Sequence, residues 1–435
     1  MVQKRLFIFT LLLMLIAAEM PAQKLVNPQE DYTWTLIQSG QSLGNPIDYR
    51  RNDHSVVYYG SVGSIYLSRD RGQSFTPIGT TIPNSTRVKN IILSEKDTLT
   101  FLVAIEASTD KIVKTTNGGN SWTVVADNLT FSYFGIPMTR DPAHPDTIYT
   151  QSNSTFMKST DFGSTWTNVN TSMPLATPCD IEVFPDSTHI ILIGDNTTGI
   201  YRSTNSGVTW SQVFTTSGEI PTIAVAKNKP GEAWATKWSG GGGLLKSTDY
   251  GATWTLVGFS GRNLWGVDVS PESADYVMTG EYSGGRIYLT KDGGLTWMTT
   301  TISSSNYSVV IADTFSIFAA QGAGFFKMNL PYPIPVELAS FSGTSENGMI
   351  NLSWITATET NNLGFDVEWS TDNSSFRRIG FVGGKGTTTS QSSYSYNFRE
   401  PLAGKNWFRL KQMDHDGSFE YSNVIEVDFE VVKNF

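Results

Sequence analysis

The sequence is poor in residues that cross-link a fold or bind metals, with one cysteine and four histidines among 435 residues. Since a single cysteine cannot form a disulfide within the chain, stability has to come from burial and strand pairing. No sequence pattern pairs Cys179 with a base, which favours a small buried side chain over a nucleophile. The histidines lack metal-ligand spacing, so we expect neither a metal site nor a cofactor.

Long apolar runs are also absent, apart from one near the N-terminus. Lys4 and Arg5 precede the apolar stretch 6–18, which is too short to span a bilayer, and Ala22 is a small residue suited to cleavage. We therefore predict a signal peptide over residues 1–22, and a mature protein that is secreted or held at the cell surface without a membrane span. The formal net charge of −9 argues against nucleic-acid binding through a basic surface.

Helical periodicity is almost missing as well. Glycine is plentiful at 39 residues, and aromatic residues make up 12% of the chain. Threonine and serine interrupt most of the short apolar runs. This composition is typical of an all-β protein.

One pattern recurs six times: Ser or Thr, any residue, Asp or Asn, any residue, Gly, any residue, Ser or Thr, and an aromatic residue. The copies, here called boxes, are Ser68–Phe75, Thr115–Trp122, Ser159–Trp166, Ser203–Trp210, Ser247–Trp254 and Thr290–Trp297. Their glycines are 43 to 47 residues apart, which is a nearly constant period. A repeat of this length with four short strands is typical of one blade of a β-propeller.

Each box lies between two strand-like runs and is predicted to be a hairpin turn. The short Asp or Asn side chain accepts hydrogen bonds from the turn's N–H groups, and glycine adopts a positive φ at little cost. The last aromatic residue begins the outer strand and is expected to pack on the neighbouring repeat. We therefore assign structural roles, rather than catalytic or metal-binding roles, to Asp70, Asn117, Asp161, Asn205, Asp249, Asp292, Trp122, Trp166, Trp210, Trp254 and Trp297.

The strand-like runs continue beyond the sixth box. Residues 308–311, 316–319 and 324–328 resemble three strands with no box after them. Residues 32–37 resemble an outer strand with no box before it, and we expect it to complete this last blade beside residues 324–328. The sequence therefore predicts a seven-bladed β-propeller over residues 32–330, closed so that no strand edge of the ring is left open.

The boxes resemble the BNR/Asp-box family, which includes sialidases, xyloglucan-cleaving endoglucanases, sortilin-type receptors and the photosystem II assembly factor. The resemblance implies the propeller fold but no particular function, because the box belongs to the scaffold. The Arg-Ile-Pro motif of the sialidases is absent, and Arg286-Ile287-Tyr288 is the nearest string. Ser61 stands where the resemblance to the xyloglucan-cleaving enzymes places a catalytic Asp.

A second domain is predicted after the propeller. The prolines of residues 331–335 indicate a stiff linker. Seven short alternating runs follow over residues 336–429, with Trp354 as a core candidate. They predict an immunoglobulin-like or fibronectin type III-like β-sandwich.

The sandwich resembles a domain of secreted Bacteroidota proteins that begins with a Pro-Val-Glu-Leu phrase, present here as Pro335-Val336-Glu337-Leu338. In those proteins a sorting tail recognised by the type IX secretion machinery follows the sandwich. Residues 430–435 resemble only the start of such a tail. The resemblance implies that this machinery is a partner if the full-length protein carries the tail.

The face opposite the boxes is the expected binding surface, because it carries the turns between second and third strands and the connections into the first strands. In the fifth and sixth blades these segments supply Trp238, Arg262, Trp265, Glu281 and Tyr282. Aromatic platforms with a few polar groups suit a glycan or a protein ligand. The first hypothesis is therefore a non-catalytic binding propeller; the alternative is a sialidase-like or xyloglucanase-like glycoside hydrolase that uses Glu281 and Asp195.

Overall fold

The computed structural model describes residues 24–26, 32–40, 45–133, 135–175, 177–302, 305–313, 316–329, 338–346, 348–388, 390–414 and 419–429. These residues form strands and turns, which confirms the all-β class, and none of their structure is a helix able to cross a membrane. They fall into two compact units, one with Thr33–Asn329 and one with the residues from 338 onward. The predicted signal peptide, linker and tail lie outside the described residues.

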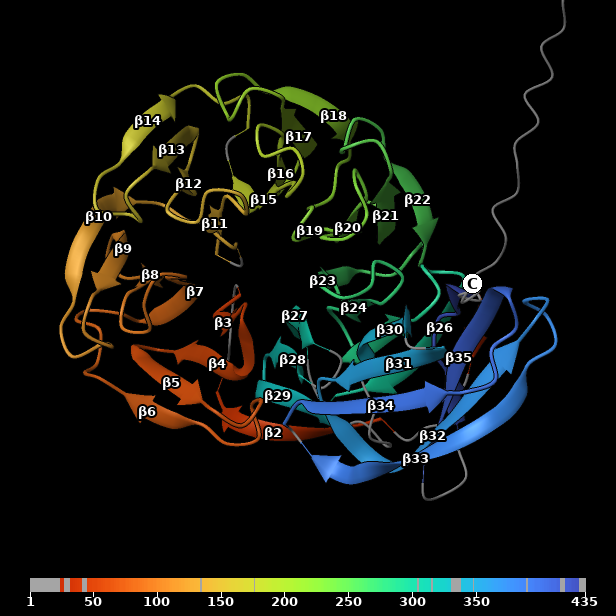
Figure 1. The fold of residues 1–435 in the computed structure, drawn as a ribbon. Coiled ribbons are helices and arrows are strands. Elements are labelled where there is room, and N and C mark those ends of the chain that lie inside the picture. Colours follow the sequence, from red (N-terminus) through yellow and green to blue (C-terminus); the bar gives the residue numbers. More distant parts are fainter. Residues whose placement is uncertain are drawn as a thin grey trace, which may run out of the picture. The chain divides into compact units, whose positions relative to one another are not determined.

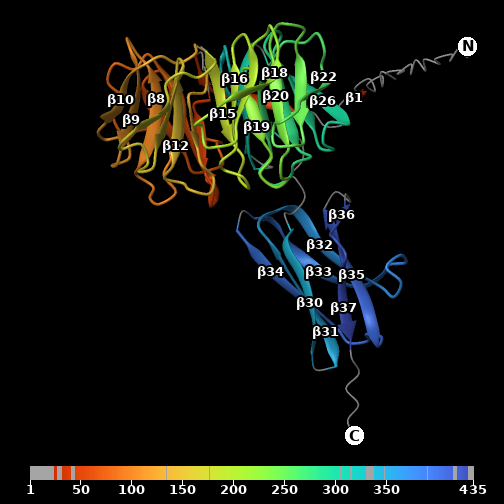
Figure 2. The same ribbon diagram turned by 90° about the horizontal axis from the view of Figure 1, so that it is seen from above.

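The described part of the first unit consists of seven sheets around a central channel (Figure 1). Figure 2 shows these sheets from the side, with strands such as β12 and β19 running between the two faces of the unit. From the channel outward, sheet 1 contains β3 (Ile47–Arg50), β4 (Asp53–Ser61), β5 (Ser64–Ser68) and β6 (Thr76–Ile78); sheet 2 contains β7 (Arg87–Leu93), β8 (Phe101–Glu106), β9 (Asp110–Thr115) and β10 (Thr123–Leu129); sheet 3 contains β11 (Met138–Arg140), β12 (Ile148–Ser152), β13 (Thr155–Ser159) and β14 (Thr167–Asn170). Sheet 4 contains β15 (Pro178–Val183), β16 (Ile191–Asp195), β17 (Gly199–Ser203) and β18 (Ser211–Thr215); sheet 5 contains β19 (Ile223–Val225), β20 (Ala233–Lys237), β21 (Gly243–Ser247) and β22 (Thr255–Gly258); sheet 6 contains β23 (Leu264–Val269), β24 (Val277–Glu281), β25 (Arg286–Thr290) and β26 (Thr296–Thr301); sheet 7 contains β27 (Asn306–Asp313), β28 (Ser316–Gln321), β29 (Gly324–Asn329) and β2 (Thr33–Ser39).

Sheet 7 joins the two ends of the first unit. Its outer strand β2 pairs antiparallel with β29, and Trp34 lies opposite Met328, in the position predicted from the sequence. A strand that the sequence analysis missed, β1 (Lys24–Val26), runs parallel to β26 and adds a fifth strand to sheet 6. Three residues are too few to show alternation, so β1 carried no signal of its own.

The boxes form the turns between the third and fourth strands of sheets 1 to 6. In the third box, Oδ1 of Asp161 accepts a 2.8 Å hydrogen bond from the Thr165 N–H, and Oδ2 accepts one of 2.7 Å from the Thr165 hydroxyl. In the fourth box, Asn205 accepts from the Thr209 N–H and donates to the Thr209 hydroxyl, both at 2.9 Å. Asp and Asn are therefore interchangeable in this turn, because both present an acceptor to the same backbone group.

The box glycine also lets each turn pack on the preceding sheet. Gly207 has a φ of +89°, and a Cβ on it would lie 2.2 Å from the ring of Phe156 in β13. Trp210, which ends the same box, meets Phe156 edge-on at 5.1 Å between ring centroids. Gly72 of the first box approaches Phe318 of sheet 7 in the same way, so the packing continues across the point of closure.

Aspartates of the innermost strands bind consecutive sheets together. In each aspartate, one carboxylate oxygen accepts a hydrogen bond from the N–H of the next residue. The other oxygen accepts one from an N–H in the innermost strand of the following sheet. The pairs are Asp48 with Leu93, Asp180 with Ile223 and Asp268 with Ile311, at 2.9, 2.8 and 2.8 Å. Asp48 and Asp180 are buried and Asp268 is half-buried, so these bonds are shielded from water to different degrees and hold together the strands that line the channel.

The second unit contains two sheets that share one apolar core. The first sheet consists of β30 (Leu338–Glu346), β31 (Met349–Thr356) and β34 (Ser392–Phe398); the second consists of β33 (Arg377–Thr388), β32 (Glu359–Ser370), β35 (Gly404–Asp414) and β36 (Phe419–Tyr421), with β37 (Ile425–Phe429) also paired to β35. Trp354 is fully buried and stacks on Tyr394 with 5.7 Å between ring centroids. The described residues thus form eight strands where seven runs were apparent, because β36 is too short to show a pattern.

Candidate functional site

The face of the first unit opposite the boxes, here called the distal face, gathers aromatic side chains from sheets 5, 6 and 7. The ring of Trp238 lies 6.0 Å from that of Trp265 and 5.7 Å from that of Tyr282, and Trp265 and Tyr282 are 5.3 Å apart. Tyr307 extends the group, 6.0 Å from Tyr282. We call these four residues the aromatic cluster. It unites three of the five residues that the sequence proposed for ligand binding, but Trp265 and Tyr307 are buried, so Trp238 and Tyr282 supply its half-buried rings.

The other two proposed residues, Arg262 and Glu281, form an ion pair with 3.3 Å between Nη1 and Oε2. The same oxygen, Oε2 of Glu281, also pairs with Nη1 of Arg286 at 3.2 Å and accepts a 2.8 Å hydrogen bond from the hydroxyl of Tyr288. Burial, together with this hydrogen bond, raises the pKa of Tyr288 to about 12. Three side chains, Arg262, Arg286 and Tyr288, therefore converge on one oxygen of Glu281.

The carboxylate of Asp195 accepts hydrogen bonds from the turn that follows it. Its Oδ1 accepts hydrogen bonds from the N–H groups of Thr197 and Thr198, both at 3.0 Å, and from the Thr198 hydroxyl at 2.6 Å. Its Oδ2 accepts from the Thr177 N–H at 3.2 Å, and the residue is 1% exposed. Four donors around one buried carboxylate indicate that Asp195 shapes the turn between β16 and β17.

Glu219 is a distal-face residue that the sequence analysis missed. Its backbone exchanges two 2.9 Å hydrogen bonds with that of Trp238, and its Oε1 accepts one of 3.2 Å from the thiol of Cys179. Burial, with a smaller contribution from Asp195, raises the pKa of Glu219 to about 7. Glu219 lies in the connection into β19, the same kind of segment that supplied Arg262, so its position in the repeat was the signal that could have found it.

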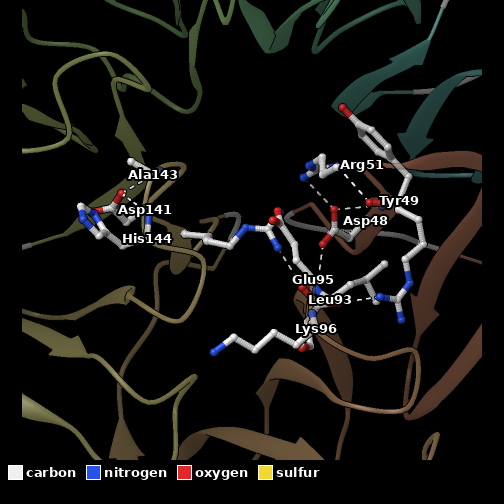
Figure 3. A network of polar contacts seen from close by, with 12 residues as sticks. Asp48, Tyr49, Arg51, Leu93, Glu95, Lys96, Asp141, Ala143 and His144 are labelled. Atoms are coloured by element: carbon white, nitrogen blue, oxygen red, sulfur yellow. Dashed lines mark hydrogen bonds and ion pairs between the residues drawn. The ribbon is translucent and has the colours of Figure 1, made fainter.

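The central channel is a concave region of about 450 Å³, with a lining drawn from the innermost strands of all seven sheets. Figure 3 shows part of its wall, where Arg51 lies beside Asp48 and Tyr49. Arg51 pairs with Asp48 at 2.9 Å, and its guanidinium lies 4.0 Å from the centre of the Tyr49 ring. Across the same wall, Arg140 pairs with Glu95 at 3.1 Å.

Glu182 of β15 and Lys227 of the turn after β19 also line this channel. Lys227 donates to the hydroxyl of Tyr49 at 3.2 Å. Burial raises the pKa of Glu182 to about 8, although the nearby charge of Lys227 acts in the opposite direction. Neither residue was singled out from the sequence, because nothing in a strand pattern shows which polar positions lie across a channel from each other. Among the described residues, no group of three His, Cys, Asp or Glu side chains is placed to hold a metal ion.

No protein-family model and no curated protein matches this sequence, but solved structures do. The GH74 enzyme of Niastella koreensis gives a TM-score of 0.57 at 15% identity, over 90% of this chain and 74% of that one. The GH74 xyloglucanase of Xanthomonas campestris gives 0.54 at 13% identity, over 90% and 75%. YCF48 bound to D1 peptide gives 0.53 at 14% identity, over 71% and 97%. These are β-propeller proteins, so the comparisons confirm the propeller fold, and at such identities they show the fold alone.

Proposed function

We propose that this chain is a secreted or cell-surface binding protein, a seven-bladed propeller followed by a fibronectin type III-like sandwich, that recognises a glycan or a protein without catalysing a reaction. The observation that carries the proposal is the aromatic cluster on the distal face, where the half-buried Trp238 and Tyr282 pack on the buried Trp265, and where Glu281, which directly precedes Tyr282, pairs with Arg262. Aromatic rings stack on sugar rings and on peptide side chains, and neighbouring polar groups set orientation. Export rests on residues 1–22 of the sequence.

The first experiment measures binding of the full chain to a glycan array and to a panel of extracellular proteins. Trp238→Ala should weaken the strongest interaction about tenfold or more, because it removes a large ring from the centre of the site. Leu295→Ala is the matched control, since Leu295 is 77% exposed within a box and lies on the opposite face. Equal binding by both variants and the unchanged protein would overturn the assignment of the site.

A second candidate function, glycoside hydrolysis, is favoured by one observation. Glu219 lies beside Trp238 of the aromatic cluster, and its pKa of about 7 keeps much of it protonated near neutral pH, as a general acid requires. A chromogenic glycoside panel and xyloglucan test this candidate. Turnover that is abolished by Glu219→Gln, Glu281→Gln or Asp195→Asn would replace the binding proposal by the hydrolase.

A further inference from the structure

Two neighbouring turns of the distal face, together with the segment between them, concentrate positive charge. The turns are residues 237–243, where β20 leads into β21, and residues 281–286, where β24 leads into β25, and residues 260–263 lead from sheet 5 into sheet 6. We call these the basic segments. Their charged residues are three basic and one acidic: Lys237, Arg262, Arg286 and Glu281. The whole chain carries a formal net charge of −9, so this part of the distal face has the opposite sign to the protein as a whole.

One residue ties the two turns together. The Oδ1 of Asn263 accepts a 3.0 Å hydrogen bond from the Ser239 N–H in the first turn, and its carbonyl accepts one of 2.8 Å from the Tyr282 N–H in the second. The rings of Trp238 and Tyr282, which the two turns carry, lie 5.7 Å apart. The charges of the basic segments and these two rings therefore belong to one connected surface.

Each turn places one cation beside an exposed glycine. The Nζ of Lys237 lies 3.8 Å from the point that a Cβ on Gly241 would occupy, and Nη1 of Arg286 lies 4.0 Å from the corresponding point on Gly284. Both glycines are exposed, so both cations lie at the tips of their turns. Within the described part of the chain, no carboxylate lies within ion-pair distance of Lys237.

Glu281 occupies only part of the hydrogen-bonding capacity of the two arginines. Its Oε2 is the shared partner of Arg262 and Arg286, whose side chains are 38% and 48% exposed. A guanidinium group carries five N–H donors, and one shared oxygen uses few of them. The planar fork of the remaining donors matches the oxygens of an anionic group such as a carboxylate.

The other acidic residues beside the aromatic cluster are withdrawn from this surface. Asp195 is 1% exposed, and its carboxylate accepts four hydrogen bonds. Glu219 is 6% exposed, and burial raises its pKa to about 7, so it carries less than a full negative charge at neutral pH. The basic segments therefore present mainly cations and aromatic rings to a ligand.

The remaining residues of the basic segments favour a sugar over a polypeptide. Besides the charged residues and the two rings, they are Ser, Gly and Asn only. They offer hydroxyl, amide and backbone groups to the hydroxyl groups of a sugar. They provide no aliphatic side chain that would form the apolar centre of a protein interface.

We propose that the distal face binds an acidic glycan, whose anionic groups pair with the three cations while a sugar ring packs on Trp238 and Tyr282. This inference rests on the proposed binding function and specifies its ligand. The anionic group is either the carboxylate of a uronic acid or a sulfate ester. Both present negatively charged oxygens to the same donors, and the probes of the test distinguish them.

The test is isothermal titration calorimetry of the full chain with two charged probes, trigalacturonate and a sulfated galactan oligosaccharide. Each is compared with its uncharged counterpart, the methyl ester of trigalacturonate and the unsulfated galactan. At least one charged probe should bind about tenfold or more tightly than its counterpart, because the counterpart keeps the sugar rings and lacks the charge. The charged probe that binds more tightly identifies the anionic group.

Variants locate this binding on the basic segments. Arg286→Gln should weaken binding of the charged probe about tenfold, and Arg286→Lys should retain part of it because the charge remains. Lys291→Gln removes one positive charge from an exposed box residue on the opposite face, and should have little effect. Added salt should weaken binding of the charged probe more than that of its counterpart, because salt screens exposed charges.

Three results would overturn the proposal. They are equal binding of the charged and uncharged probes, equal loss in Arg286→Gln and Lys291→Gln, and binding of a blocked triglutamate peptide without binding of either charged glycan. The first of these, combined with loss of binding in Trp238→Ala, would leave the proposed binding function standing without a preference for acidic sugars. The failure of this inference is thus distinguishable from the failure of the proposed function.

Discussion

The titration of Glu182 should make the folded protein less stable as pH rises, and one substitution at this residue can test this effect. A glutamate in the unfolded chain has a pKa of about 4.3, whereas burial raises the pKa of Glu182 to about 8 in the folded protein. Between these values the folded state binds one proton more than the unfolded state, so the free energy of unfolding falls as pH rises, and it levels off above about pH 8.

Glu182→Gln removes this dependence, because the amide does not titrate. We expect the variant to be more stable than the unchanged protein at about pH 9, by about 1–2 kcal/mol, with the difference vanishing near pH 4. Urea unfolding of both proteins at several pH values measures this difference in the free energy of unfolding. A difference that stays constant from pH 4 to pH 9 would show that Glu182 is ionised or paired in the folded protein.

The boxes offer a test with a control built into the sequence. Asp161→Ala removes the acceptor for both the N–H and the hydroxyl of Thr165, and should lower the free energy of unfolding by about 1–2 kcal/mol. Asp161→Asn should cost little, since Asn205 makes the same contacts in the next box. Thermal unfolding of the two variants distinguishes these outcomes, and an equal loss would mean that the charge, rather than the turn geometry, matters.

At the scale of elements, strand β2 closes the ring of sheets, and N-terminal truncations test this role. A chain that starts at residue 30 lacks β1 but keeps β2, whereas a chain that starts at residue 40 lacks both. Loss of β2 exposes the edge of β29 and the ring of Phe326, so the second truncation should lower the melting temperature by several degrees or more. The first should leave it nearly unchanged. Equal melting curves would contradict closure by β2.

The strands of the first unit could be predicted from the sequence because the boxes recur at a nearly constant spacing. The period of the boxes located β2 beside β29, because an outer strand without a box and three strands without a partner had to complete each other. Strand β1 and strand β36 were missed, since neither is long enough for alternation to appear. The contacts between Asp180 and Ile223 were missed because hydrogen bonds between sheets leave no local pattern.

For the whole molecule, the aromatic cluster could be predicted in part because equivalent positions of successive repeats converge on one face. Trp238, Trp265 and Tyr282 were found in this way, and they do meet. What their position could not show is that Glu281 would be surrounded by Arg262, Arg286 and Tyr288. Burial and ion pairing are properties of the assembled ring, so the state of each carboxylate was open until the structure was known.

Hydrogen–deuterium exchange with and without the strongest ligand from the binding screen tests the assignment of the distal face most directly. We expect protection in residues 237–243, 262–265 and 281–286, which carry Trp238, Trp265 and Tyr282 of the aromatic cluster together with the ion pair, and unchanged exchange in the boxes. Protection confined to the boxes or to the second unit would place the ligand elsewhere and contradict the account.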